Sequence, residues 1–122
     1  PLKLARKYQG EAEELLGKLG VLPAQVYPYV SEHIKEISDM VQAIMDNGYA
    51  YKTSDGIYYR VRKFKDYGKL SGQNIDKIIS GARINVNEDK EDPIDFALWK
   101  FKERNDQPSF ETPLGWGRPG WH

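Results

Sequence analysis

The chain has 122 residues, of which 39% are hydrophobic and 30% charged, a composition typical of a globular rather than a disordered protein. Its 18 basic and 18 acidic residues cancel, so any electrostatic recognition of nucleic acid or membrane must come from a local patch. The absence of cysteine excludes disulfides and a thiolate zinc site within these residues, and no apolar run is long enough to cross a membrane.

The first predicted element is an amphipathic helix over residues 4–19. Its apolar side chains recur mostly three or four residues apart, which favours a helix with one side in a core. Gly20 is available to cap its end. Residues 21–28 contain two prolines and form the first candidate domain boundary.

A second helix is predicted over residues 31–47, with Ser31 as its N-cap and Gly48 as its C-terminal glycine cap. Five apolar residues at helical spacing form one stripe that we expect to be buried: Ile34, Ile37, Val41, Ile44 and Met45. His33 lies beside that stripe. Because no second residue of metal-ligand type stands at helical spacing from it, we interpret it as a surface or capping histidine.

Residues 49–61 predict a β-hairpin whose turn is signalled by Asp55-Gly56. The face expected to be apolar on the returning strand comprises Ile57, Tyr59 and Val61. Four tyrosines occupy the hairpin, at positions 49, 51, 58 and 59. They could stack on nucleobases, but sheets favour aromatic residues for packing alone, and packing is the preferred interpretation.

The only basic cluster of the chain follows the hairpin, with five positive charges around the single acid Asp66. Its members are Arg60, Arg62, Lys63, Lys65 and Lys69. Such residues supply the sequence-independent part of nucleic-acid affinity by contacting phosphates. A strand edge kept soluble by charge would look the same, and the sequence favours neither interpretation.

The second half of the chain alternates loops and short elements. We expect an ordered loop at residues 67–71, a short helix over 74–81, a strand over 82–86 and a solvated acidic turn over 87–92. The density of apolar side chains in residues 93–102 predicts core.

Asp95 is expected to cap a helical turn or to hold a backbone amide. A loop is predicted over residues 103–113. Residues 115–122 combine three glycines and one proline with two tryptophans, which indicates either a rigid, ligand-facing turn or a flexible tail.

Three ordered motifs resemble the cysteinyl-tRNA synthetase family. They are DYGKLS at residues 66–71, DFALWK at 95–100 and GRPGWH at 117–122, and the last is similar to the segment that leads into the family's active site. Residues 31–34 and 47–51 fit between them in the expected order. The resemblance covers most of the chain, which therefore reads as an internal fragment of such an enzyme.

The resemblance implies an α+β fragment, a small antiparallel sheet with flanking helices inserted into a Rossmann-like catalytic domain. Residues 1–28 would end the first Rossmann half, residues 29–113 would form the connective insertion, and residues 114–122 would re-enter the catalytic domain. The full enzyme would activate cysteine with ATP and magnesium, recognise the cysteine thiolate with zinc, and charge tRNA(Cys) in the cytoplasm. The family's ATP motifs and zinc ligands would lie outside this chain.

For this chain the resemblance implies one substrate-contacting residue, Trp121, and no catalytic or metal-binding residue. The isolated fragment would be an inactive monomer that binds no cofactor and no membrane, joins the catalytic halves and shapes the approach of the tRNA acceptor end. Tentative tRNA contacts are the five basic residues 60, 62, 63, 65 and 69. Two alternatives stay open: a fragment of the related cysteine ligase of mycothiol synthesis, and a stand-alone RNA-binding module.

Overall fold

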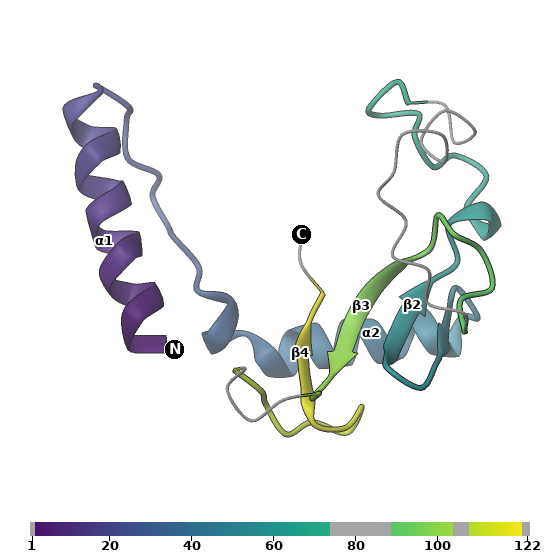
Figure 1. The fold of residues 1–122 in the computed structure, drawn as a ribbon. Helices are drawn as coiled ribbons and strands as arrows, with labels where there is room; N and C mark the ends of the chain where they lie inside the picture. Colours follow the sequence, from purple (N-terminus) through teal and green to yellow (C-terminus); the bar gives the residue numbers. More distant parts are fainter. Residues whose placement is uncertain (1, 74–88, 104–107, 121–122) are drawn as a thin grey trace.

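The protein's structure, a computed structural model, describes residues 2–73, 89–103 and 108–120. A helix and a small sheet form two layers, and a further helix stands apart from them (Figure 1). The helices are α1 (Leu2–Lys18) and α2 (Ile34–Asp46), and two short 3-10 turns are η1 (Val30–Glu32) and η2 (Val61–Lys63). The strands are β1 (Ala50–Lys52), β2 (Gly56–Tyr59), β3 (Phe96–Phe101) and β4 (Gly117–Pro119). The predicted α+β class with a small antiparallel sheet is confirmed.

The sheet is antiparallel throughout, in the order β1-β2-β3-β4. Trp99 lies at its centre, paired with Ile57 on one side and Pro119 on the other, and its side chain is fully buried. The core predicted within residues 93–102 is therefore confirmed. Burial of such a large ring makes Trp99 the main apolar contribution to the core. The buried core cluster comprises Val41, Ala50, Ile57, Trp99 and Leu114.

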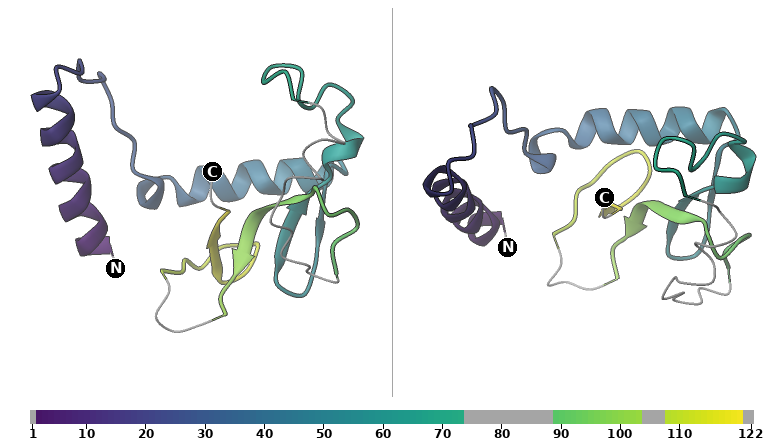
Figure 2. Two further views of the ribbon diagram at one scale, coloured as in Figure 1. Left: turned by 45° about the horizontal axis from the view of Figure 1, so that its top comes forward. Right: turned by 90° about the horizontal axis from the view of Figure 1, so that it is seen from above.

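Helix α2 packs across one side of the sheet, and Figure 2 shows the two layers from above. Its predicted stripe is confirmed, because Val41 is buried and the other four members pack against the core cluster. The helix ends as expected at Gly48, whose φ of 75° is one that glycine adopts without strain. The N–H of Gly48 donates to the Met45 carbonyl and that of Tyr49 to the Ile44 carbonyl, which is the Schellman pattern.

The predicted start of α2 is wrong. Ser31 lies inside η1 and is no N-cap, because the chain first makes a 3-10 turn from Tyr29. His33 takes the N-cap position and makes no side-chain capping hydrogen bond. The sequence pattern placed the helix start one 3-10 turn too early, an error typical of boundaries.

Helix α1 has almost the predicted bounds, but its predicted burial is wrong. None of its residues is buried, and the large side chains expected in a core, such as Leu15 and Leu16, are exposed. Its described contacts with the rest of the chain include an ion pair from Arg6 to Glu32 and the Arg6 guanidinium lying over the Tyr29 ring. Neither described helix is both long and apolar enough to cross a membrane.

The predicted hairpin is confirmed as β1 and β2, joined by residues 53–55. The pairing of β2 with β1 is regular, so Ile57 and Tyr58 lie on opposite faces of the sheet. Both are buried, Ile57 in the core cluster and Tyr58 against Tyr51, whereas Tyr59 is only half-buried. The register shift between β2 and β3 passes over Leu98 on β3. Val61, expected on the strand, belongs instead to η2, where it is fully buried.

The turn of the hairpin is tied to β3 by an ion pair between Asp55 and Lys100, joined by the Tyr58 hydroxyl. Burial alone would raise the pKa of Asp55. Hydrogen bonds from Lys100, Thr53 and Tyr58 to the carboxylate outweigh that effect and lower the pKa to about 2. The carboxylate is therefore charged at neutral pH and holds the turn against the neighbouring strand.

The terminal glycine-rich segment is neither a turn nor a tail over its described residues. Gly117–Pro119 form β4, which pairs with β3. The loop predicted over residues 103–113 reaches this strand, because Phe110 makes an isolated β-bridge with Gly117. Glycine is required at 117 because a Cβ there would lie 2.2 Å from the Lys100 carbonyl oxygen and 2.5 Å from Trp99 Nε1. The helix predicted over 74–81, the strand over 82–86 and Trp121 lie outside the described residues.

We expect Gly117→Ala to destabilise the sheet by about 1–3 kcal/mol, because the added methyl group must displace backbone. Gly10→Ala is the matched control. Its Cβ would meet nothing within 4 Å, and α1 buries no residue, so the sheet should be unaffected. Urea unfolding followed by tryptophan fluorescence, to which the buried Trp99 contributes, measures both. Equal midpoints for the two variants would show that the backbone does not approach Gly117 this closely.

Candidate nucleic-acid interface

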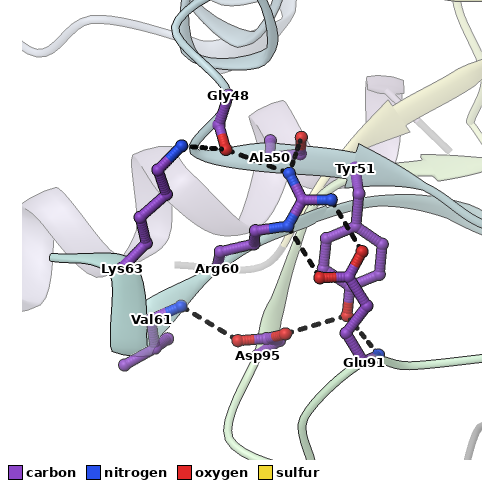
Figure 3. A network of polar contacts seen from close by, with 8 residues as sticks. All are labelled: Gly48, Ala50, Tyr51, Arg60, Val61, Lys63, Glu91 and Asp95. Atoms are coloured by element: carbon purple, nitrogen blue, oxygen red, sulfur yellow. Dashed lines mark hydrogen bonds and ion pairs between the residues drawn. The ribbon is translucent and has the colours of Figure 1, made fainter.

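Asp95 is a buried carboxylate that joins three separate segments of the chain. Its side chain is 4% exposed and accepts hydrogen bonds from the Val61 N–H and the Tyr51 hydroxyl, each 2.9 Å long. The same hydroxyl accepts a hydrogen bond from the Glu91 N–H, also at 2.9 Å. The hairpin, η2 and the segment before β3 therefore meet at one carboxylate (Figure 3). The expectation that Asp95 holds a backbone amide is confirmed.

Burial of the Tyr51 ring beside this carboxylate raises the pKa of its hydroxyl to about 12. Loss of its proton would create a second negative charge next to Asp95. The hydroxyl accordingly stays protonated across the physiological range and can donate to Asp95 throughout it. Tyr51 also stacks on Tyr58, with ring centroids 6.1 Å apart, and both rings are buried. Packing is the role of this pair.

Arg60 fastens the acidic segment 89–92 to the hairpin. Its Nε and Nη2 donate to the two carboxylate oxygens of Glu91 at 2.7 and 2.6 Å, a bidentate pairing. Its Nη1 donates to the carbonyl oxygens of Gly48 and Ala50 at 2.9 and 3.0 Å, and the guanidinium carbon lies 4.9 Å from the centre of the Tyr51 ring. The hydrogen bonds with Glu91 raise the pKa of Arg60 and lower that of Glu91, so both stay charged.

The second arginine of the basic cluster is paired in the same way, since Arg62 Nε donates to Asp92. Burial would raise the pKa of Asp92, but the Ile94 N–H and Arg62 outweigh this and lower it. The expected solvated acidic turn is exposed at Glu91 and half-buried at Asp92, and both carboxylates neutralise the two arginines. The available signal was a basic run at residues 60–69 and an acidic run at residues 87–92, which carry opposite charge. The sequence does not show that these two oppositely charged runs, about 30 residues apart, form ion pairs with each other.

The three lysines of the cluster keep more of their charge available. Lys63 Nζ donates to the Gly48 carbonyl at 3.1 Å, which uses one of its three protons, and lies 5.0 Å from the centre of the Tyr49 ring. Lys69 forms an exposed ion pair with Asp66, a kind that contributes little to stability and exchanges readily. Lys65 is exposed and has no ion-pair partner among the described residues.

Two expected residues remain, His33 and Trp121, and the structure describes only His33. His33 is exposed at the start of α2. Within the described part of the chain, no group of three or more histidine, cysteine or acidic side chains is arranged to hold a metal ion. Trp121 lies outside that part, but the residue before it is held firmly, because the Gly120 N–H donates to the Leu98 carbonyl at 2.8 Å.

Comparison with known proteins links this arrangement to one family. The sequence model of the class I (C) tRNA synthetase catalytic domain matches residues 2–122. A cysteine–tRNA ligase of Thermococcus onnurineus is 49% identical over all 122 residues, and that of Carboxydothermus hydrogenoformans is 47% identical over the same length. That of Methanococcus maripaludis is 50% identical over 107 residues, or 88% of the chain. The chain spans about a quarter of the length of these curated relatives, from 22% to 26%.

We expect Asp95→Asn to destabilise the chain by about 1–3 kcal/mol. The amide oxygen can replace only one carboxylate oxygen, so either the Val61 N–H or the Tyr51 hydroxyl loses its buried partner. Asp39→Asn is the control, because Asp39 meets Lys35 in an exposed ion pair on α2. Its denaturation midpoint should equal that of the unmodified chain. Equal midpoints for both variants would refute the joining role of Asp95.

Proposed function

Because this chain belongs to the family of class I (C) tRNA synthetase catalytic domains, we propose that it is part of a longer cysteine–tRNA ligase, here called the parent enzyme. The proposal rests on the sequence identity of 47–49% between the whole chain and cysteine–tRNA ligases of two other organisms. The motifs at residues 66–71, 95–100 and 117–122 support the same assignment. The parent enzyme activates cysteine with ATP and transfers it to tRNA(Cys).

The chemistry of activation resides in the remaining three-quarters of the parent. Zinc, when bound there, supplies a soft Lewis acid that prefers the cysteine thiolate to the hydroxyl of serine. We place the sites of zinc, ATP and magnesium in the segments of the parent outside this chain. This segment's own work is to join the two catalytic halves and to guide the acceptor end of tRNA towards them. Alone it carries out no cysteine-dependent reaction.

The sheet supports this joining role mechanically. Pro119 of β4 pairs with the fully buried Trp99, and Gly120 is hydrogen-bonded to β3. The backbone up to Gly120 is therefore fixed, which suits our proposal that the next residue, Trp121, lines the cysteine pocket. The division into residues 1–28, 29–113 and 114–122 is part of this proposal, with the last segment anchored to the insertion's sheet before it re-enters the catalytic domain.

The tRNA-facing role is supported by the unequal state of the five basic residues. Arg60 and Arg62 are held by carboxylates and position the acidic segment, so their contribution to tRNA binding is chiefly structural. Lys63, Lys65 and Lys69 are the groups that meet phosphate, since each is exposed and none is held by a buried carboxylate. The parent acts in the cytoplasm, and no membrane takes part in this role.

The names of the relatives favour tRNA charging over the related ligase of mycothiol synthesis. The parent should attach cysteine to tRNA(Cys), whereas a mycothiol-type ligase would join it to an amino sugar. A stand-alone RNA-binding module is disfavoured by family membership, which extends over residues 2–122 and includes both helices and the sheet.

The function is tested by cysteine-dependent ATP–pyrophosphate exchange, which needs no tRNA. The full-length parent should catalyse it, and Trp121→Ala should raise the KM for cysteine with that for ATP nearly unchanged. Trp116→Ala, at the exposed tryptophan five residues earlier, should leave both constants alone. If the parent did not catalyse this exchange, the assignment as a cysteine–tRNA ligase would be wrong. A proportional rise of both constants in Trp121→Ala would remove only the pocket role of Trp121.

The phosphate contacts are tested by the salt dependence of tRNA affinity. Replacing Lys63, Lys65 and Lys69 with glutamine in the parent should reduce the slope of log affinity against log salt. Each lost phosphate contact should contribute about 0.7 to 0.9. Lys35→Gln, in an exposed pair on α2, is the control and should leave the slope unchanged. If the triple variant keeps the original slope, the lysines serve solubility rather than tRNA.

A further inference from the structure

An apolar groove with aromatic walls lies between the end of α2 and the hairpin. It has a volume of about 430 Å³, its walls include the rings of Tyr49, Tyr59 and Phe64, and Met40 and Ile44 line its helical side. We call it the aromatic groove. Phe64 is 45% exposed, and Tyr49 and Tyr59 are half-buried. This differs from the neighbouring pair Tyr51 and Tyr58, whose rings are buried and unavailable to a ligand.

The rings of the groove are supported from behind. Tyr49 and Tyr59 are nearly parallel, with 14° between their planes and 6.5 Å between their centroids. Tyr59 also contacts Phe96, at 5.3 Å, and Tyr67, at 6.5 Å. Contact with several rings restricts the motion of Tyr59, so little conformational entropy would be lost when a flat ligand binds against it.

The rim of the groove is positive and its lining is neutral. Lys63 and Lys65 flank Phe64 in the sequence, and Lys63 Nζ lies 5.0 Å from the centre of the Tyr49 ring. None of the described residues that line the groove carries a carboxylate. Aromatic walls with cations at the edge suit a nucleobase joined to a phosphate, because every base has a stacking face and every phosphate a negative charge.

The groove also continues towards the segment that precedes Trp121. A second hollow, of about 540 Å³, shares Met40 and Ile44 with it and reaches Pro119 and Gly120, and Glu36 is the one acid among the described residues that line it. A single strand lying in both would thus follow α2 from the aromatic walls to the start of the cysteine pocket. Mainly apolar hollows with aromatic walls do not suit an intact duplex, whose bases are not available for stacking.

We propose that the aromatic groove binds an unpaired nucleobase of the single-stranded 3′ end of tRNA, which stacks on Phe64 between Lys63 and Lys65. The proposal rests on the function proposed above, and it assigns Phe64 a part in tRNA binding that the basic cluster alone does not supply. Tyr49 and Tyr59 line the same groove, and the two lysines hold the adjoining phosphates.

The test is a double-mutant cycle in the full-length parent. One change is Phe64→Ala, and the other is a tRNA with one unpaired 3′ nucleotide made abasic, each position in turn. Stacking is worth about 1–3 kcal/mol per base. Phe64→Ala should therefore weaken the Kd for intact tRNA by roughly 5- to 150-fold, at 1.4 kcal/mol per tenfold. At one position, base removal should cost as much in the unmodified parent and almost nothing further in Phe64→Ala.

Two controls separate stacking from general damage. Phe64→Tyr keeps a flat ring and should keep the affinity. Trp116→Ala removes an exposed ring that also has a lysine beside it, Lys102, but contacts no other ring in the described part of the chain, and it should have no effect on tRNA binding. The salt slope should stay the same in Phe64→Ala, because no phosphate contact is lost.

The proposal would be overturned if, at every 3′ position, Phe64→Ala and base removal each weakened the Kd by the same factor whether or not the other change was present. An unchanged Kd in Phe64→Ala would overturn it too. A loss of thermal stability in the parent with Phe64→Ala, accompanied by equal losses with intact and shortened tRNA, would also overturn it, since the groove would then be covered by the parent itself. If the unmodified parent catalyses cysteine-dependent ATP–pyrophosphate exchange, the proposed function stands, and any of these outcomes contradicts only the role of the aromatic groove.

Discussion

The buried carboxylate of Asp95 is the constraint on which the arrangement of the sheet depends. Removing a charge from water is costly, and here the cost is offset by the Val61 N–H and the Tyr51 hydroxyl. These donors come from η2 and from β1, while Asp95 itself immediately precedes β3. Distant parts of the sequence must therefore assemble around it together. Once they do, β3 is positioned to bury Trp99 between its neighbouring strands.

The same junction determines which charges remain at the surface. Glu91 is held by its N–H on Tyr51 and by its carboxylate on Arg60, so the acidic segment lies against the hairpin. The two arginines are thereby neutralised by carboxylates, and the uncompensated positive charge of the basic cluster is left to its lysines. A neutral chain thus presents a limited basic surface without a net positive charge.

Two parts of the chain relate very differently to this core. Helix α1 leaves its apolar side exposed, and Figures 1 and 2 show it apart from the sheet in every view. The final strand is the opposite case: β4 pairs with β3 and the Gly120 N–H is bonded to Leu98. The approach to Trp121 is therefore rigid, whereas the opening helix depends on contacts that the described residues do not provide.

The sequence alone was sufficient for features that depend on near neighbours. Apolar spacing predicted α2 and its buried stripe, and glycine at 48 predicted its end, because helix periodicity and a positive φ are local properties. The motifs at residues 66–71, 95–100 and 117–122 were likewise enough to recognise the family. Tertiary structure decided what depends on distant partners. Glu91 and Asp92 form ion pairs with arginines about 30 residues away, and Gly117 and its neighbours form a strand. Helix α1 is not buried, although its apolar pattern predicted that it would be. Spacing shows which face of a segment is apolar or charged, but not what will lie against it, since that contact exists only after the chain has folded.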